Sequence, residues 1–194
     1  MLQTFQNIDT SLFLFLNGFH NGFFDHVMIW ITRSMIWIPL YLVFLYLVIR
    51  HYKWQTLIIL VFTVLMILVS DQLTNLVKES VQRLRPSHEP GLMVHIVDAY
   101  KGGTYGFYSA HASNNFAIAC FLILLLGKYY HYFFIPVLIY ALIMSYSRIY
   151  LGLHYPGDTL AGMIAGILIG LIMGKLCAWS LKQEYFSFQQ KKPG

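Results

Sequence analysis

Long apolar runs follow one another along the 194-residue chain, separated by short segments that contain charged residues, glycine or proline. Bounding the runs at such residues predicts membrane-spanning helices over residues 12–32, 35–49, 54–77, 112–127, 133–150 and 158–181. The runs approach the roughly 20 apolar residues that a helix needs to cross the hydrocarbon layer. The pattern therefore predicts an all-α fold, a polytopic membrane helical bundle of about six transmembrane helices, in which residues 1–194 form a single domain.

The first apolar run is the least regular one. Polar residues and glycine interrupt it at Asn17, Gly18, His20, Asn21, Gly22 and Asp25. A broken helix, or a helix that lies in the membrane interface, therefore fits this segment as well as a continuous span does. Whether the chain crosses the membrane five or six times depends on it. We expect the run to be retained, because residues 1–10 lack the positive region of a secretory signal peptide.

Two polar segments interrupt the later part of the chain. Residues 83–109 form the longest non-apolar stretch, and their prolines and glycines predict a loop outside the hydrocarbon. Residues 147–158 separate the last two predicted spans. Counting the spans places both segments on the same side of the membrane, so we expect them to meet over one end of the bundle. Loops of this length usually carry function.

The third predicted span carries a stripe of polar residues at intervals of four and three, namely Asp71, Asn75, Lys78, Gln82 and Arg85. This spacing predicts one helix face, which should avoid lipid because ionisable residues inside a membrane normally face the bundle interior. Lys78 and Arg85 would then lie about 10 Å apart along the helix, close enough to bind one anion. Alternatively, Lys78 reaches toward the interface and Arg85 pairs with Glu79 or Glu89.

A second polar cluster, Tyr108-Ser109-Ala110-His111, directly precedes the apolar run that begins near residue 112. A helix N-terminus presents unpaired N–H groups that suit a phosphate oxygen, and Ser109 and His111 would add side-chain donors. The alternative is that Ser109 or Ser113 only caps the helix.

The third cluster contains Arg148, His154 and Asp158. Arg148 ends an apolar run, where a guanidinium needs an anionic partner. His154 and Asp158 flank Pro156 and Gly157, and this tight turn can bring the carboxylate back to the imidazole. A carboxylate that holds one ring nitrogen leaves the other free for attack, so His154 is a candidate nucleophile. Asp158 could also cap the helix that follows.

Together, three fixed cations, two histidines and one carboxylate indicate a phosphoryl-transfer site, because positioned cations stabilise the charge of that transition state. Composition supports a membrane setting, since 58% of residues are hydrophobic and 11% are charged. The net charge of +5 comes from scattered basic residues, which excludes nucleic-acid binding. Cys120 and Cys177 lie inside apolar runs, which is typical of packing.

The chain resembles the type-2 phosphatidic acid phosphatase family. The family's first motif matches Lys78 through Arg85-Pro86, and its third matches Ser147-Arg148, His154 and Asp158. The second motif, Pro-Ser-Gly-His, differs here by Tyr108 and Ala110. If the glycine position needs a positive φ, alanine there costs on the order of 1 kcal/mol. The motifs lie within residues 78–158, and the predicted spans extend the resemblance over the whole chain.

The resemblance implies a role for each matching residue. His154 would attack phosphorus, Asp158 would orient it, and His111 would protonate the leaving oxygen. The phosphate would be held by Lys78, Arg85, Ser109, the Ala110 N–H and Arg148. The activity implied is a membrane lipid phosphatase with a phosphohistidine intermediate and no metal or other cofactor. Its expected partners are a lipid phosphate substrate and the membrane.

Two other classes of protein share part of this pattern. A metal centre built on His88, His95, His111, His154 and Asp158 is disfavoured, because each cation about 4 Å from a dication would cost roughly 8 kcal/mol at an effective dielectric near 20. A non-catalytic lipid transporter would also place polar residues inside spans. Binding alone does not require the His111, His154 and Asp158 set, so the phosphatase is favoured. The sequence leaves the oligomeric state open.

The favoured substrate is undecaprenyl pyrophosphate, followed by phosphatidylglycerophosphate or another glycerolipid phosphate and then by lipid A.

The basic residues indicate the orientation in a bacterial cytoplasmic membrane. Those predicted on the side away from the motifs are Arg50, Lys53, Lys128, Lys182, Lys191 and Lys192. The motif side holds Arg33, Arg83 and Lys101 besides the expected phosphate ligands. We therefore expect the active site to face the periplasm or the cell exterior.

Overall fold

The computed structural model describes the backbone of residues 2–190 and the side chains of residues 3–183. The α-helices are α1 (Leu2–Asn17), α2 (Gly22–Thr32), α3 (Ile38–Tyr52), α4 (Thr56–Val81), α5 (Ala110–Leu126), α6 (Phe134–Tyr150) and α7 (Pro156–Gln190). Short 3₁₀ helices form η1 (Ser34–Trp37), η2 (Lys53–Gln55) and η3 (Pro86–His88). Over residues 2–190 the only β pairing is an isolated bridge between Leu84 and Tyr105. The predicted all-α bundle is confirmed.

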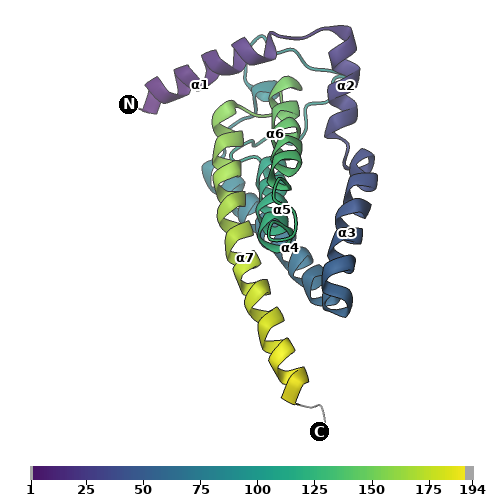
Figure 1. Ribbon diagram of the computed structural model, residues 1–194. Helices are drawn as coiled ribbons and strands as arrows, with labels where there is room; N and C mark the ends of the chain where they lie inside the picture. The colour runs from purple at the N-terminus through teal and green to yellow at the C-terminus, as the bar shows by residue number, and fades with distance from the viewer. Residues whose placement is uncertain (1, 191–194) are drawn as a thin grey trace.

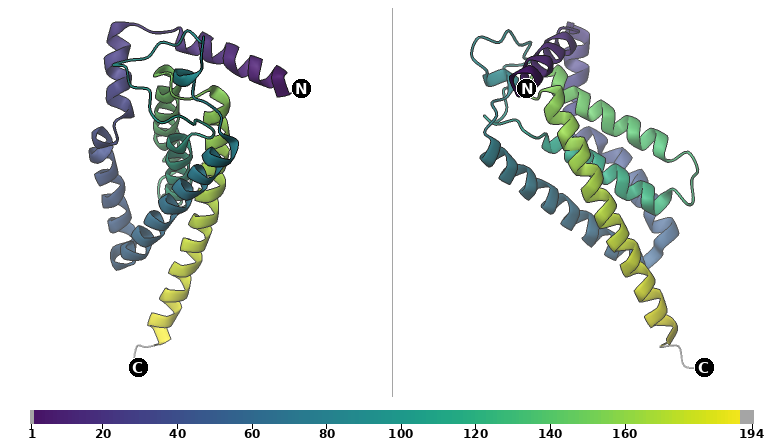
Figure 2. Two further views of the ribbon diagram at one scale, coloured as in Figure 1. Left: turned by 180° about the vertical axis from the view of Figure 1, so that it is seen from behind. Right: turned by 90° about the vertical axis from the view of Figure 1, so that its left-hand side faces the viewer.

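The helices form a bundle with α5 at its centre, packed against α4, α6 and α7. Figure 1 shows α1 lying across one end of the bundle, while α2 and α3 follow each other along one side. The two further views in Figure 2 show α4 returning from the far end of α3 and α7 extending beyond the other helices. The long loop between α4 and α5 and the short loop between α6 and α7 lie at the end that α1 crosses.

The first predicted span is broken, as its polar interruption allowed, and the break separates α1 from α2. Asn17 causes it by hydrogen bonding outside its own helix. Its side chain is 2% exposed and donates to the carbonyl oxygen of Tyr150 at 2.8 Å, while its Oδ1 accepts from the His95 N–H at 2.8 Å. Asn21 then caps α2 by accepting from the Phe24 N–H at 2.9 Å. The chain therefore turns here and does not continue as one helix.

Backbone contact between α5 and α7 positions the two helices that begin at the predicted motifs. Gly162, Gly166 and Gly170 are spaced four apart on α7, and a Cβ at each would meet, in turn, the carbonyl oxygens of Ser109, Ser113 and Ala117 at the start of α5 and along it. Small residues at this spacing let two helices approach closely in a membrane. We name these three glycines the glycine seam. The sequence reasoning missed it, although the four-residue spacing was visible.

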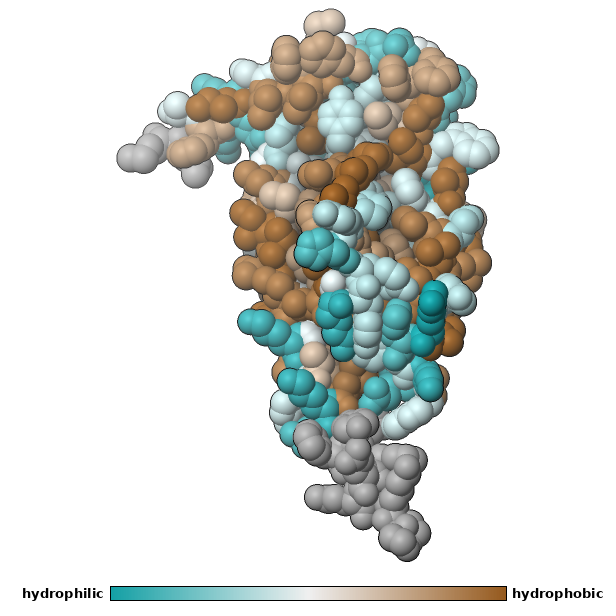
Figure 3. Space-filling model, in the orientation of Figure 1, coloured by the Kyte–Doolittle hydropathy of each residue, from teal (hydrophilic) through white to brown (hydrophobic). Residues whose placement is uncertain are grey.

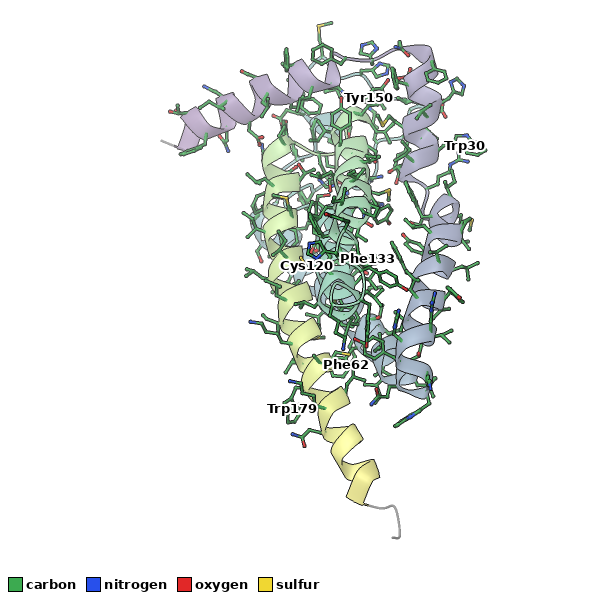
Figure 4. All side chains as sticks on the ribbon, viewed as in Figure 1. Trp30, Phe62, Cys120, Phe133, Tyr150 and Trp179 are labelled. Atoms are coloured by element: carbon green, nitrogen blue, oxygen red, sulfur yellow. The ribbon has the colours of Figure 1, made fainter. Side chains whose placement is uncertain are left out.

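The outer surface of the bundle is apolar. Long hydrophobic side chains on α3, α4 and α7 are exposed, including Leu42, Leu57, Val61, Val64, Ile164, Leu168 and Ile172. Figure 3 shows hydrophobic residues over the sides of the molecule and hydrophilic residues at its upper end and over its lower part. Trp30 and Trp179 are 62% and 63% exposed and lie toward opposite ends in Figure 4, which is typical of interfacial anchors. Ser34–Val81 and Pro156–Gln183 are helical stretches long and apolar enough to cross a membrane.

The prediction that one helix face carries the polar stripe is wrong for its last two residues, Gln82 and Arg85. The helix stops at Val81, because Gln82 adopts a left-handed conformation with φ of 51°. Arg85 follows in extended backbone with φ of −71° and ψ of 155°, so it does not share a helix face with Lys78. Asn75 and Gln82 are exposed, whereas Asp71 accepts a hydrogen bond from Asn114 of α5 at 2.8 Å. Only part of the stripe faces the bundle.

Candidate active site

Backbone hydrogen bonds join the three predicted motifs at one end of the bundle. The segment that carries Arg85 runs beside the following loop, with the Arg85 N–H donating to Thr104 O at 3.1 Å and the Gly106 N–H donating to Arg83 O at 2.8 Å. The Ser109 N–H donates to Asp158 O at 3.0 Å, which connects the start of α5 to the start of α7. The two polar loops therefore meet, as the sequence predicted.

Arg85 and Arg148 are buried and have donors without a partner. They are 8% and 4% exposed, and Arg85 Nη1 and Arg148 Nε make no hydrogen bond with any described residue. Arg85 Nε donates to Tyr105 O at 3.2 Å, and Arg148 Nη1 donates to Thr32 Oγ1 at 2.6 Å. The guanidinium of Arg85 also lies against Gly102, where a Cβ would be 2.8 Å from Nη1 and the φ of +66° favours glycine. These guanidinium groups are held in place with free donors, as an anion site requires.

His154 lies among the predicted cations. The residue is 1% exposed, in the loop between α6 and α7. Burial, followed by the charges of Arg85, Arg148 and Lys78, lowers its pKa well below the ordinary value of 6.5. The imidazole is therefore neutral at neutral pH and keeps a lone pair for attack. No acidic side chain among residues 3–183 forms an ion pair with Lys78, Arg85 or Arg148, so pairing of Arg85 with Glu79 or Glu89 is ruled out.

Asp158 faces His154 across 3.6 Å, measured from its Oδ2 to Nδ1 of the imidazole. This distance is longer than a hydrogen bond, and Nδ1 has no partner among the described residues. Asp158 Oδ2 accepts from the Tyr155 N–H at 3.0 Å, and Oδ1 accepts from Arg83 at 2.8 Å. The structure thus brings the carboxylate to the imidazole as predicted. It also adds Arg83, which the sequence analysis counted only as a basic residue on the motif side of the membrane.

Ser109 is the N-cap of α5, accepting from the Ala112 N–H at 3.4 Å, so the capping alternative is correct for its oxygen. Its hydroxyl hydrogen can still be donated. Ala110 begins the helix and is not among the residues with positive φ, which explains why alanine is accepted in place of glycine. His111 follows in the first turn of α5, close enough to Arg148, Arg85 and Lys78 for their positive charges to interact with its imidazole. All the predicted site residues therefore gather at this end.

A cavity of about 330 Å³ opens beside His111 and Arg148. The end of α2, the loop before α5 and the residue after α6 line it as well, with Ile29, Thr32, Arg33, Val97, Asp98, Tyr100 and Leu151. Sequence reasoning did not assign Arg33, Asp98 or Tyr100 to the site, because they are distant from the motifs along the chain. A ligand in this cavity would contact His111, Arg148 and the Thr32 hydroxyl at the end of α2.

The histidines weighed for a metal centre separate in the fold. His95 Nε2 pairs with Asp25 Oδ1 at 2.9 Å, and its ring stacks on His20 with centroids 3.6 Å apart. His88 lies next to Ser87, whose hydroxyl is 3.2 Å from its Nδ1. Neither ring contributes to the cluster around His154. The metal-centre alternative therefore lacks two of its proposed ligands.

Comparisons with known proteins agree with this arrangement. A family model described as PAP2 superfamily matches residues 56–181. A lipid A 4'-phosphatase of Bacteroides thetaiotaomicron is 41% identical over 171 residues, which are 86% of this chain and 75% of that protein. A lipid A 4'-phosphatase of Porphyromonas gingivalis is 31% identical over 174 residues, covering 87% of this chain and 72% of that protein.

Solved structures share the fold. A transmembrane PAP2-type phosphatidylglycerolphosphate phosphatase from Bacillus subtilis superposes with a TM-score of 0.68 at 22% identity, covering 89% of this chain and 86% of that chain. LpxE from Aquifex aeolicus superposes with a TM-score of 0.64 at 23% identity, covering 85% of this chain and 93% of that chain.

Proposed function

Because this chain belongs to the PAP2 superfamily and is a membrane lipid phosphatase, we propose that it removes the 4'-phosphate of lipid A. The observation that carries the substrate is the 41% identity to a lipid A 4'-phosphatase over 75% of that protein's length. The sequence alone favoured undecaprenyl pyrophosphate and ranked lipid A third. The named relatives support the lipid A alternative instead.

The cavity beside the cations supports a sugar phosphate as substrate. Arg33, Asp98 and Tyr100 line it and offer donors and acceptors near His111 and Arg148. Sugar hydroxyls next to a phosphate ester can use such groups, whereas an isoprenoid next to a pyrophosphate has no hydroxyl to offer. A site built to hydrogen-bond a hydroxyl rejects substrates that lack it, because its polar groups are then left unpaired.

The chemistry proposed is nucleophilic attack by His154. Nδ1 faces Asp158, so Nε2 attacks phosphorus and forms a P–N bond while the bond to the leaving oxygen breaks. The negative charge of the bound phosphate offsets the surrounding cations, so His111 carries a proton in the complex and donates it to this oxygen. In the second step His111 accepts a proton from water, which attacks phosphorus and breaks the P–N bond to release inorganic phosphate.

The phosphate oxygens are held by fixed charges in this proposal. Arg85 Nη1 and Arg148 Nε supply unpartnered donors, and Lys78 adds a third positive charge. The Ser109 hydroxyl and the Ala110 N–H at the start of α5 complete the set. Charge that develops on the equatorial oxygens is stabilised by groups already in position, so we propose that no metal is needed.

The active site faces away from the cytoplasm in this proposal. Arg50, Lys53 and Lys128 lie at or near the ends of helices opposite the motif loops, and Lys182 lies in the part of α7 that points away from those loops. Positive residues favour the cytoplasmic side. Lys191 and Lys192, which the sequence analysis also counted there, lie outside the described residues.

A substrate panel tests the proposed function. Purified protein in detergent and excess EDTA is given lipid A, undecaprenyl pyrophosphate or phosphatidylglycerophosphate, and released phosphate is measured. We expect kcat/KM to be at least about tenfold higher for lipid A, a difference of about 1.4 kcal/mol in transition-state binding. Mass spectrometry of the lipid product should show loss of the 4'-phosphate. Faster hydrolysis of undecaprenyl pyrophosphate would reject the substrate, and activity that requires added magnesium or zinc would reject the metal-free mechanism.

A further inference from the structure

Arg83 joins two carboxylates that are far apart in the sequence. Its Nη2 donates to Asp9 Oδ2 at 2.7 Å, and its Nη1 donates to Asp158 Oδ1 at 2.8 Å. The guanidinium carbon also lies 4.0 Å from the centre of the Tyr155 ring. The side chain of Arg83 is 21% exposed, and those of Asp9 and Asp158 are 15% and 0% exposed. Three fixed contacts therefore restrict this guanidinium.

Asp9 uses both of its carboxylate oxygens. While Oδ2 accepts from Arg83, Oδ1 accepts from the Gly157 N–H at 2.7 Å. Gly157 is in the first turn of α7, where backbone N–H groups lack partners within the helix and negative charge is favoured. Asp9 of α1 thus holds the turn from which Asp158 projects.

Arg83 decides which oxygen of Asp158 faces the imidazole. With Oδ1 bound to Arg83, Oδ2 is left to accept from the Tyr155 N–H and to face His154 Nδ1 at 3.6 Å. We propose that Asp9, acting through Arg83 and the Gly157 N–H, is a positioning residue that holds the Asp158 carboxylate against His154. This inference rests on the roles proposed above for His154 and Asp158.

Asp9 is not required to attach α1 to the bundle. Phe13, one turn further along α1, is fully buried, and its ring contacts Tyr155 edge-on with centroids 5.4 Å apart. Asn17 adds the hydrogen bonds to His95 and Tyr150 described above. Substitution of Asp9 should therefore leave α1 in place and change the carboxylate network alone.

The test compares variants of Asp9 with a matched control on the same helix. Asn7 is an exposed polar residue of α1, so Asn7→Ala is the control. Each full-length variant is assayed in detergent on a lipid phosphate that the wild-type protein hydrolyses, whichever lipid that proves to be. We expect Asp9→Ala to lower kcat by about 10- to 100-fold with KM within about twofold of wild type, because a small misplacement of a catalytic group is costly while the phosphate ligands remain. Asp9→Asn keeps an acceptor for Gly157 and should lose less.

A double-mutant cycle separates positioning from a structural role. In an Asp158→Asn background, Asp9→Ala should lower kcat by less than about twofold, because the carboxylate it positions is gone. Thermal unfolding in detergent identifies any variant that fails to fold, in which case Asp9→Asn takes its place in the cycle. The proposal is overturned if Asp9→Ala behaves like Asn7→Ala, if it changes KM alone, or if it lowers kcat equally in both backgrounds. If lipid A is not a substrate, the same outcomes can be measured with another lipid phosphate that the wild-type protein hydrolyses.

Discussion

At the scale of single residues, the unusual groups are buried donors without acceptors. Arg85 Nη1 and Arg148 Nε are enclosed by protein, and no described residue accepts from them. A buried unsatisfied polar group costs about 1–3 kcal/mol, and more when it is charged. Such groups persist where a ligand completes them, so they support the proposed phosphate site independently of the motifs.

The roles of His154 and Asp158 can be separated by substitution. His154→Asn should abolish turnover, because it removes the attacking nitrogen. Asp158→Asn should lower kcat by on the order of 10²- to 10⁴-fold and leave residual activity, because the carboxylate orients the imidazole and does not attack. A radiolabelled phosphate substrate should leave an acid-labile, base-stable label on wild-type protein. Label that persists in His154→Asn would assign the nucleophile to another residue, with His111 the next to examine.

Protonation of His154 provides a second prediction at this scale. Because its pKa lies well below 6.5 in the folded protein, the imidazole should stay neutral as the pH falls from 8 to 6.5. The unfolded chain binds that proton more readily, so this residue lowers stability progressively below about pH 6.5 and has no such effect above it. NMR of ¹³C-labelled histidine in detergent, assigned by the resonance missing from His154→Asn, measures the titration directly. A titration midpoint of His154 at or above pH 6.5 would contradict the lowered pKa of its imidazole.

The motif spacing predicted which residues meet, but it could not reveal what holds them. Arg83 and Asp9 are 74 positions apart, and neither lies at a motif position. Their pairing depends on α1 crossing the end of the bundle, a tertiary feature with no local signal in the sequence. Arg33 and Asp98 were also missed, because they come to the cavity from the end of α2 and from the loop before α5, which are distant along the chain.

At the scale of helices, apolar periodicity predicted all the spans after the first, with ends within about four residues of those observed except at the end of α7, which continues to Gln190 and not to the predicted residue 181. It failed where conformation rather than hydrophobicity ends a helix. Gln82 takes a left-handed conformation that glycine or asparagine usually occupies, so nothing in its residue type indicated the end of α4. The same misjudgement placed Arg85 on a helix.

The glycine seam makes the spacing of α5 and α7 sensitive to a single side chain. Gly166→Leu should destabilise the protein by about 1–3 kcal/mol or more and lower kcat, because a Cβ there meets Ser113 O and forces apart the helices that carry His111 and Asp158. Thermal unfolding and kcat in detergent measure both effects. Ile172→Ala on the outer face of α7 is the control, since Ile172 is 59% exposed. An unchanged kcat in folded Gly166→Leu would show that the seam does not position the site.

At the scale of the whole molecule, the arrangement of α1, α2 and α3 changes how the N-terminal third relates to a membrane. Helices α2 and α3 run one after the other in the same direction, and α1 crosses the end where the motif loops lie (Figures 1 and 2). This arrangement favours an interfacial α1, whose Phe5, Ile8 and Phe15 are exposed. The crossing count, five or six, stays a prediction.

Orientation can be tested from the C-terminal end of the chain. The motif loops and the far end of α7 lie at opposite ends of the bundle, so an outward-facing site requires a cytoplasmic C-terminus. A fluorescent protein fused after Gly194 should fluoresce, whereas an alkaline phosphatase fused there should be inactive. The reverse pattern would place the active site in the cytoplasm and favour a substrate in the inner leaflet.

Positive charge gathered around His154 has a consequence for the end of each catalytic cycle. Without an anion, Lys78, Arg85 and Arg148 repel one another in a region shielded from water. Inorganic phosphate relieves that repulsion, so the product should be a competitive inhibitor and should raise the melting temperature of the protein. At 100 times its Kd, phosphate would contribute about 2.7 kcal/mol, and Arg148→Ala should abolish most of this shift. A melting temperature that does not change with phosphate would show that the three cations do not destabilise the empty site. Release of phosphate would then not limit the turnover of the enzyme.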